Sequence, residues 1–356
     1  MSDLQKIISV ADYGQISKSI ESCVAQQIYY LELHITDVCN SNCYFCNQKD
    51  LRIQGKEIDF GILKSFLTQM KSYGLRGVRI SGGGEPTTYS RLDDLLDLLL
   101  FLQIKLIRFD TNGISLTPEL SRKLISTGLQ HLHVSLQAPT GKTWSLITGK
   151  NPCYYERIVN NIDAFSELDV DNKVDINVSF VFDENTYIEL EKIVQFSKAH
   201  TVNYFIHAIN SYDYSDFFKR ACIPELMRQI KQTPELKSSC QWALVSLNVE
   251  PWMHKLPDRF YDSICFAPWT SALVKSNGDV YRCCEHQHEL GILGNINNDA
   301  FIDLWNDVKI KDIRYRAKEL FFYKNFFDPP CPNRCAAKIG LFSIPELSQK
   351  IEKILF

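Results

Sequence analysis

The sequence predicts an α/β protein built around a partial (β/α)6 barrel of parallel strands. The first indication is a regular alternation of short apolar runs with amphipathic stretches between about residues 29 and 210. Alternation of this kind is typical of parallel strands joined by right-handed helical crossovers. The second indication is the number of repeats, because six strand–helix units fit an open partial barrel better than a closed barrel of eight.

The expected elements follow one another along the chain. The strands are apolar runs at residues 29–35, 77–81, 106–111, 131–136, 174–182 and 202–207. The helices are amphipathic stretches at residues 60–73, 91–101, 118–127, 155–167 and 185–200. Because active sites of parallel α/β sheets lie at the carboxyl ends of the strands, we expect functional side chains in the loops that follow these strands.

The barrel is expected to occupy residues 29–210, with four further parts around it. Residues 1–28 form an N-terminal extension, and residues 211–264 form an irregular linking segment that contains one helix at about 224–231. The last two parts are a small cysteine-rich domain at 265–340 and a C-terminal helix within 341–356.

The composition is that of an ordinary globular protein, with 45% hydrophobic residues, 23% charged residues and a net charge of −3. No basic face indicates binding to nucleic acid, and neither a signal peptide nor a membrane-spanning apolar stretch is found. The 12 cysteines therefore indicate reduced, metal-binding thiols in a cytoplasmic protein rather than a disulfide framework.

Three cysteines with the spacing C-x3-C-x2-C follow the first expected strand: Cys39, Cys43 and Cys46. Three thiolates on one short loop can hold three corners of a 4Fe–4S cluster and leave one iron open, whereas a usual all-protein site supplies four thiolates. A partial zinc site is the alternative, although zinc sites usually pair a C-x2-C unit with a second pair or with histidines. Here the first spacing is three residues, and no histidine follows nearby.

The cysteine loop, with Phe45 just before its last thiol, resembles the cluster loop of the radical S-adenosylmethionine (radical SAM) enzymes. In that family the open iron holds the amino and carboxylate groups of SAM, and reductive cleavage gives a 5′-deoxyadenosyl radical that takes a hydrogen atom from the substrate. The glycines after the second strand resemble the family's GGE motif. The resemblance implies that Gly83, Gly84 and Glu85 bind the methionine amino group of SAM.

The same resemblance implies further SAM contacts at the strand ends. Asn112 follows the third strand, and Ser135 and Gln137 end the fourth, where the family contacts the ribose or the carboxylate of SAM. Many relatives carry Asp at the position of Gln137, and an amide accepts both bonds of a diol less readily than a carboxylate. Asn177 on the fifth strand and His207 at the end of the sixth are candidates for the ribose and adenine, the alternative being satisfied core groups.

Five cysteines lie in the last quarter of the chain. Asn277-Gly278 is a strong turn signal that predicts a hairpin over 273–283 and brings Cys265 and Cys283 together. The pattern resembles the SPASM and twitch auxiliary-cluster domains, and five cysteines fit the twitch form with one auxiliary 4Fe–4S cluster. Cys284 is the expected spare, although it can exchange with its neighbour, and structural zinc is the alternative. The implied ligands are Cys265, Cys283, Cys331 and Cys335.

The resemblance implies hydrogen abstraction from a small polar metabolite (sugar-like or aminocyclitol-like) or a peptide, leading to dehydrogenation, epimerisation or cross-linking. Peptide maturation or activation of another protein is the alternative reaction, and a non-enzymatic zinc-binding module is the alternative of another class. Only 38 residues precede Cys39, so we expect no N-terminal leader-binding domain. A flavodoxin or ferredoxin is implied as reductant, and Cys222 or Cys240 is a candidate hydrogen donor if it is not a buried structural cysteine.

Overall fold

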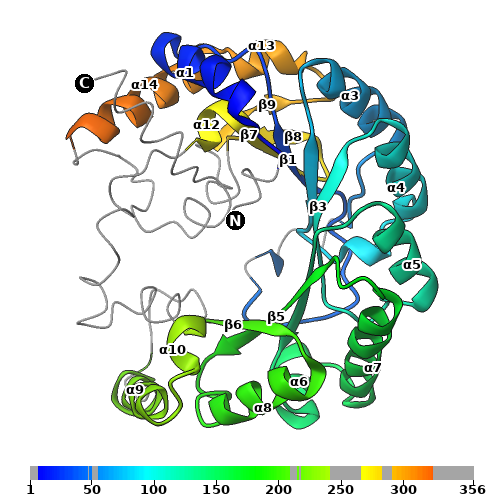
Figure 1. The fold of residues 1–356 in the computed structure, drawn as a ribbon, viewed down its shortest axis with the longest axis vertical. Coiled ribbons are helices and arrows are strands. Elements are labelled where there is room, and N and C mark those ends of the chain that lie inside the picture. Colours follow the sequence, from blue (N-terminus) through cyan, green and yellow to red (C-terminus); the bar gives the residue numbers. More distant parts are fainter. Residues whose placement is uncertain are drawn as a thin grey trace.

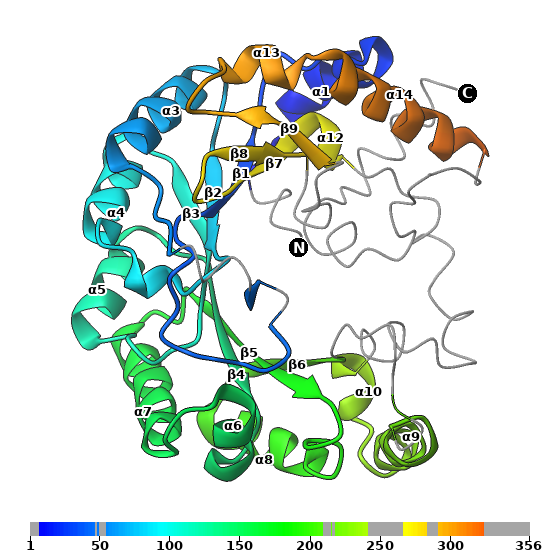
Figure 2. The same ribbon diagram turned by 180° about the vertical axis from the view of Figure 1, so that it is seen from behind.

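The computed structural model describes residues 7–46, 48–49, 55–208, 215, 218–240, 266–282 and 291–323. Its centre is one nine-stranded sheet in the order β6-β5-β4-β3-β2-β1-β7-β8-β9. Figures 1 and 2 show that the sheet curves into an open barrel with helices on its outer side. The predicted α/β architecture, with parallel strands in a partial barrel, is confirmed.

All six predicted strands are present, and each is parallel to the next one along the chain. This order follows from the sequence, because a helical crossover places successive parallel strands side by side. The bounds are β1 (Tyr30–His34), β2 (Gly77–Ser81), β3 (Lys105–Thr111), β4 (His131–Gln137), β5 (Asp175–Phe182) and β6 (Asn203–Ala208).

The five predicted helices cover the outer side of the barrel (Figure 1). Local capping fixes where two of them begin. The side chain of Asp59 accepts a hydrogen bond from the Ile62 amide, and Thr117 accepts one from the Leu120 amide directly before Pro118. The bounds are α3 (Phe60–Ser72), α4 (Leu92–Phe101), α5 (Pro118–Ser126), α7 (Cys153–Leu168) and α8 (Leu190–His200).

Helix α8 begins five residues later than predicted, at Leu190 rather than Asn185. The carboxylate of Asp183 accepts hydrogen bonds from the amides of Asn185 and Thr186, both at 2.9 Å. These bonds stabilise a turn that competes with the first turn of a helix. The predicted helix of the linking segment is confirmed as α9 (Ile223–Gln232), which follows a π-helical turn, η4 (Phe218–Cys222).

Several short elements were not predicted. Helix α6 (Gly141–Thr148) lies between β4 and α7, and it is capped by Thr140, whose side chain accepts from the Thr143 amide. Gly149 ends α6 in the left-handed region, with φ of 66°. The other elements are η2 (Val10–Asp12), α1 (Tyr13–Ser22), η3 (Pro86–Thr88) and α10 (Leu236–Ser239).

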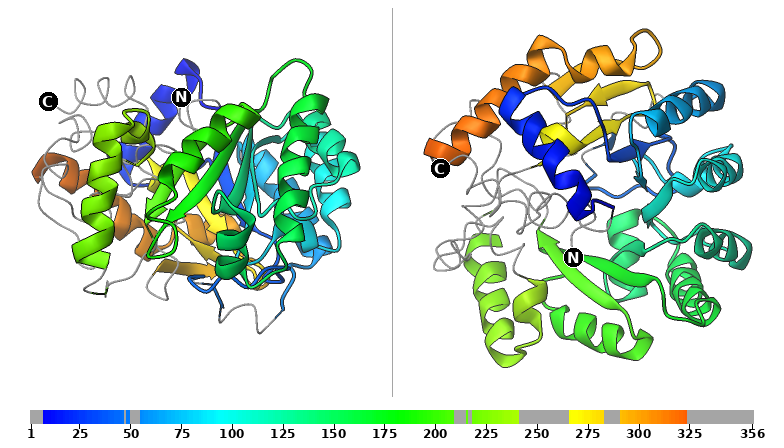
Figure 3. Two further views of the ribbon diagram at one scale, coloured as in Figure 1. Left: turned by 90° about the horizontal axis from the view of Figure 1, so that it is seen from below. Right: turned by 45° about the horizontal axis from the view of Figure 1, so that its top comes forward.

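The described part of the C-terminal unit extends the barrel sheet. Strand β7 (Ser271–Val274) is parallel to β1, and β8 (Asp279–Tyr281) and β9 (Ile292–Asn295) follow antiparallel, as the right panel of Figure 3 shows. Strands β7 and β8 form the predicted hairpin, and Gly278 supplies the φ of +87° that its turn requires. The helices are α12 (Ala267–Thr270), α13 (Phe301–Trp305) and α14 (Val308–Tyr323).

A row of charged side chains crosses the sheet on β1 to β4. The Glu32 carboxylate lies 3.4 Å from Arg79, whose Nε donates to Asp110 at 2.7 Å, while Arg108 donates to the other Asp110 oxygen at 2.6 Å. Burial alone would raise the pKa of Asp110, but Arg108 and Arg79 hold it well below its usual value. Burial, together with Arg108, lowers the pKa of His133, so this ring is neutral.

Leu31, Leu33, Val78 and Ile80 alternate with these charged residues along β1 and β2 and belong to the hydrophobic core. The strands are therefore buried on both faces, which is typical of a parallel sheet. Among the described residues, no helix is long and apolar enough to cross a membrane.

Candidate active site

The cysteine loop leaves the barrel at the carboxyl end of β1, as predicted. Cys39, Cys43 and Cys46 are all half-buried. The loop turns back on itself, because the Cys46 amide donates to the Cys43 carbonyl oxygen at 3.2 Å. The hydroxyl of Ser41 lies 3.5 Å from the Cys43 sulfur, so the loop offers this thiol a hydrogen-bonding partner.

Helix α6, which was not predicted, holds the middle of the cysteine loop. The Asn42 amide donates to the Thr148 carbonyl oxygen at 3.0 Å, and the Tyr44 amide donates to that of Ile147 at 3.1 Å. Both acceptors belong to the last turn of α6, whose carbonyls have no partner inside the helix. The loop therefore satisfies the end of the helix, and the helix fixes the backbone between the cysteines.

The glycine loop after β2 packs against the other side of the cysteine loop. The Gly84 amide donates to the Thr36 carbonyl oxygen at 2.9 Å, and the Glu85 amide donates to that of Val38 at 2.8 Å. There is no room for a side chain at this contact, since a Cβ on Gly84 would lie 2.0 Å from the Val38 oxygen. A Cβ on Gly83 would lie 2.6 Å from the Asp37 carboxylate.

Glu85 is buried, and its carboxylate accepts four hydrogen bonds. Oε1 accepts from the Thr111 hydroxyl at 2.6 Å, the Thr87 hydroxyl at 2.8 Å and the Thr87 amide at 3.2 Å, and Oε2 accepts from the Asn112 amide at 2.7 Å. A carboxylate has about two acceptor positions on each oxygen, so these contacts saturate Oε1 and leave one position on Oε2. Glu85 thus joins the ends of β2 and β3 as a positioning residue, and its role as the partner of the SAM ammonium stays a prediction.

Glu85→Ala is expected to destabilise the metal-free protein by about 3 kcal/mol, because the buried Thr111 hydroxyl and Asn112 amide lose their acceptor. Urea unfolding of the metal-free variant measures this change. The control is Glu156→Ala, at an exposed glutamate, which should change stability by less than about 0.5 kcal/mol. Unchanged stability in Glu85→Ala, combined with lost SAM binding, would instead make Glu85 a direct SAM ligand.

Asn112, Ser135 and Gln137 lie at the carboxyl ends of β3 and β4. The Asn112 side chain donates to Asn40 Oδ1 at 2.6 Å, which ties β3 to the residue after Cys39. Gln137 has a φ of 72° and sits at an irregularity in the pairing of β4 with β5, and its buried Oε1 atom has no partner among the described residues. A strained backbone with an unsatisfied acceptor favours a role in ligand binding.

His207 and Asn177 lie at different levels of the barrel. His207 is near the carboxyl end of β6, its buried Nδ1 atom has no partner in the described part of the chain, and burial lowers its pKa to about 4. It is therefore neutral and can accept a hydrogen bond. On β5, Asn177 lies opposite His133 of β4 and opposite Asn203, the first residue of β6. Its side-chain amide donates to the Asp175 carbonyl oxygen. The structure thus brings His207, and not Asn177, to the end of the sheet where the cysteine loop lies.

The two candidate hydrogen donors, Cys222 and Cys240, are buried in the hydrophobic core. Burial raises the pKa of Cys222 to about 11 and that of Cys240 to about 12. Both side chains are therefore neutral thiols at physiological pH. Their packing agrees with the alternative that Cys222 and Cys240 are buried structural cysteines. Their role as hydrogen donors stays a prediction.

The hairpin turn of the C-terminal unit contacts the start of the cysteine loop, which the sequence did not indicate. The Ser276 hydroxyl donates to the buried Asp37 carboxylate at 2.7 Å. Asp37 lies two residues before Cys39, so this bond joins β7 and β8 to the loop that carries the three thiols. The predicted ligands of the auxiliary site and the spare cysteine lie outside the described residues: Cys265, Cys283, Cys284, Cys331 and Cys335.

In the described part of the chain, no three metal-ligating side chains already converge on one point. The assignment of a metal cluster to the cysteine loop therefore rests on the type of ligand, because thiolates are the soft ligands that iron–sulfur clusters use.

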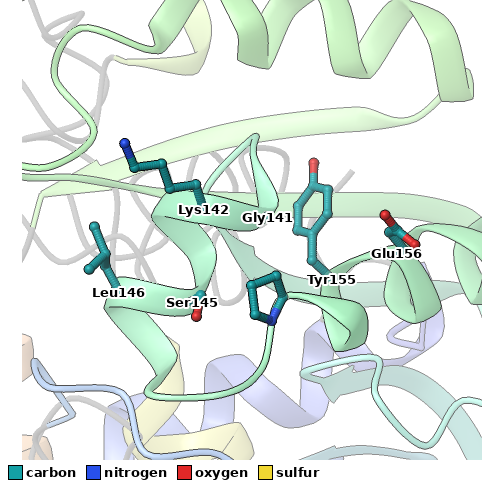
Figure 4. A pocket seen from close by; sticks show the side chains of 7 residues that line it. Gly141, Lys142, Ser145, Leu146, Tyr155 and Glu156 are labelled. Atoms are coloured by element: carbon teal, nitrogen blue, oxygen red, sulfur yellow. The ribbon is translucent and has the colours of Figure 1, made fainter.

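A surface pocket of about 500 Å³ lies between α6 and α7, lined by Lys142, Leu146 and Tyr155 among others (Figure 4). It contains none of the predicted site residues and is separate from the cysteine loop.

Family models match most of this architecture. The model of the radical SAM superfamily matches residues 33–197, from β1 through the cysteine and glycine loops to α8. The chain belongs to the radical SAM superfamily. A second model, an iron–sulfur cluster-binding (SPASM) domain, matches residues 265–336 and encloses all five late cysteines. The iron–sulfur cluster-binding model over the late cysteines agrees with this membership.

Curated relatives of this radical SAM enzyme include probable GTP 3′,8-cyclases. The protein from Saccharolobus islandicus (strain M.14.25 / Kamchatka #1) is 31% identical over 178 residues, which are 49% of this chain and 54% of that protein. The protein from Thermoplasma volcanium is 29% identical over 137 residues, 38% of this chain and 41% of that protein. The chain spans about half the length of the curated relatives it matches.

Solved structures resemble a larger part of this radical SAM enzyme. Streptococcus suis SuiB bound to precursor peptide SuiA has a TM-score of 0.59 at 19% identity, covering 85% of this chain and 70% of that chain. Native anSMEcpe with bound AdoMet and Kp18Cys peptide has a TM-score of 0.59 at 17% identity, covering 83% of both chains. These likenesses show that the fold is shared.

Proposed function

We propose that Cys39, Cys43 and Cys46 hold a 4Fe–4S cluster at which SAM is bound and reductively cleaved. The observation that carries this proposal is the three-thiol loop at the carboxyl end of β1, fixed by α6 on one side and by the glycine loop on the other. When bound, the cluster and SAM supply a 5′-deoxyadenosyl radical that takes a hydrogen atom from a substrate C–H.

The residues of the chain position SAM in this proposal. Gly83 and Gly84 let the glycine loop pack closely against the cysteine loop, next to the proposed position of the methionine part of SAM, and Glu85 joins the ends of β2 and β3 there. Gln137 and His207 offer acceptor atoms, unpaired among the described residues, to the hydroxyl and amino groups of the nucleoside. Ser135 and Asn112 also lie at strand ends, while Asn177 is a weaker candidate because of its lower position.

We infer a second, auxiliary 4Fe–4S cluster held by Cys265, Cys283, Cys331 and Cys335. Its support is the match of an iron–sulfur cluster-binding domain over these positions. A cluster with four protein thiolates has no open iron for substrate, so it would carry electrons. A flavodoxin or ferredoxin is the proposed source of the reducing electron.

A peptide is the substrate class we favour. The structures solved with bound peptides resemble 83% or more of this chain, whereas the similarity to the probable GTP 3′,8-cyclases covers 49% of it. A small polar metabolite is the second candidate, and the similarity to proteins named as nucleotide cyclases supports it. Dehydrogenation, cross-linking and epimerisation are the candidate outcomes for either substrate.

The test is anaerobic reconstitution followed by reduction with dithionite in the presence of SAM. We expect about eight irons per chain, broad absorption near roughly 400 nm and formation of 5′-deoxyadenosine. Stoichiometric zinc with no iron would contradict the proposal and favour a non-enzymatic zinc module. Reactions of peptide and metabolite fractions in deuterated water then distinguish the outcomes, since deuterium gained at constant composition indicates epimerisation and the loss of two hydrogens indicates oxidation.

A further inference from the structure

His34 is the last residue of β1, and it faces the inside of the barrel. The residues on either side of it, Leu33 and Ile35, belong to the hydrophobic core that the strands share with the outer helices. Successive side chains of a strand point to opposite faces, so His34 points inward. Its neighbour on β2 is Ser81, the residue directly before the glycine loop. His34 therefore lies on the inner wall, at the end of the sheet where the cysteine loop and the glycine loop begin.

The carboxylate of Glu32 fixes which nitrogen of the His34 ring carries a hydrogen. The ring Nε2 atom lies 3.0 Å from Glu32 Oε1. Burial alone would raise the pKa of Glu32, but Arg79 and His34 hold it below its ordinary value, so the carboxylate is ionised and can only accept. Nε2 is therefore the donor, and Nδ1 of the neutral ring is an acceptor. Nδ1 is buried and has no partner among the described residues.

Lys275 is the neighbour of His34 on β7, which runs beside β1 (Figure 2). The two strands are parallel with Leu33 opposite Val274, so the residues that follow these two, His34 and Lys275, are neighbours on the other face. The Lys275 amide donates to the Asp279 carbonyl oxygen at 2.9 Å, which continues the pairing of β7 with β8 through this residue. The exposed fractions are only 4% for His34 and 8% for Lys275, so both polar side chains are buried in the inner wall.

The ammonium group of Lys275 has unused hydrogen-bond donors. Its Nζ atom lies 4.7 Å from the centre of the Tyr281 ring, and in the described part of the chain it has neither an ion pair nor a hydrogen bond. Burial lowers the pKa of Lys275, although Asp37 and Asp279 act in the opposite direction. Because these two carboxylates already offset the charge of the ammonium, the position favours a neutral acceptor over a further anion.

His34 and Lys275 thus offer an acceptor and a donor side by side. An apolar ligand would leave both groups buried and unpaired, which is unfavourable. A neutral group that both donates and accepts a hydrogen bond satisfies the two together. An extended peptide residue is such a group, because its N–H and its C=O point to the same side, as they do at the edge of a sheet.

We propose that His34 and Lys275 form a substrate subsite between β1 and β7, where Nδ1 accepts a backbone N–H of the peptide and the ammonium donates to the C=O of the same residue. This inference rests on the proposed function and narrows it, because it places the peptide inside the barrel beside the cysteine loop. A hydroxylated metabolite carries the same two kinds of hydrogen-bonding group, and the test distinguishes it.

The first test is turnover of the peptide fraction that the wild type converts. His34→Gln keeps an amide that can reach Glu32 but removes the acceptor at Nδ1, and Lys275→Met keeps the apolar stem but removes the donors. We expect each change to raise KM about tenfold or more. An unchanged KM, or a loss of SAM affinity in these variants, overturns the inference. Lys105→Met is the control, because it removes an exposed lysine at the amino end of β3 and should leave KM unchanged.

The second test needs no natural substrate. The reconstituted protein, labelled with [15N]histidine, is titrated separately with N-acetylalanine N-methylamide, glycerol and acetate. We expect the dipeptide analogue to change the Nδ1 resonance of His34, which His34→Gln identifies, in the wild type but not in Lys275→Met. A change with glycerol alone overturns the peptide in favour of a hydroxylated metabolite, and a change with acetate alone, or with no probe, overturns the subsite. Absence of iron and of SAM cleavage refutes the proposed function instead, since this titration depends on neither.

Discussion

Replacement of Cys39, Cys43 and Cys46 by alanine is expected to remove about half of the bound iron and all formation of 5′-deoxyadenosine. The reason is that these three thiols lie on a single loop at the carboxyl end of β1 and are proposed to hold one of two clusters. The chain should still fold, because the three side chains are half-buried and lie outside the hydrophobic core. Iron analysis and chromatography of the SAM products measure the two effects.

The matched control for this prediction is Cys153→Ala. Cys153 is an exposed, free cysteine at the start of α7 and is not among the proposed ligands. Its replacement should leave the iron content and the cleavage of SAM unchanged. Full iron content in the triple alanine variant would show that the loop does not bind a cluster and that the site has been assigned to the wrong cysteines.

Gly84→Ala is expected to weaken SAM binding more than about tenfold, through a change that adds a single methyl group. The new Cβ would lie 2.0 Å from the Val38 oxygen and 2.6 Å from the Asp37 carbonyl carbon. Both neighbours are backbone atoms and cannot rotate away, so the glycine loop and the cysteine loop must separate. Overpacking of this kind also destabilises proteins by about 1–3 kcal/mol.

Equilibrium binding of SAM to the reconstituted variant, together with urea unfolding, measures this effect. Gly14→Ala is the control, because Gly14 lies in α1, a Cβ added there would meet no described atom within 4 Å, and its backbone does not need a positive φ. That substitution should leave SAM binding unchanged and stabilise the helix slightly. Wild-type affinity in Gly84→Ala would mean that the two loops are not held together as the structure describes.

The local signals in the sequence were sufficient for the barrel. Each of the six strands was predicted, since an apolar run followed by an amphipathic stretch is a property of neighbouring residues. The hairpin of β7 and β8 was predicted for the same reason, because Asn277-Gly278 is itself the turn. The cysteine loop and the glycine loop were predicted to lie at the same end of the sheet, and the hydrogen bonds from Gly84 and Glu85 confirm that they touch.

Other features depend on contacts between distant residues. Helix α6 was missed because its eight residues are few, yet its last turn holds the cysteine loop at Asn42 and Tyr44. The expected role of Glu85 in binding the SAM amino group was inferred from its position in a motif. Two of its hydrogen bonds, however, come from the end of β3, 26 and 27 residues later. A sequence pattern shows which side chains are available but not which donors surround them.

The sequence by itself determined the type of sheet, the positions of its six barrel strands and the loop that carries the three thiols, because each of these depends on local pattern and spacing. Only the tertiary structure decided that β7 joins the sheet beside β1, and that Ser276 bonds to Asp37 at the start of that loop. It also placed Arg314 of α14 against α12, where the Arg314 Nε donates to the Pro268 carbonyl oxygen. These arrangements require segments separated by tens to hundreds of residues to meet, and their free energy comes from burial and pairing that no short stretch of the chain contains.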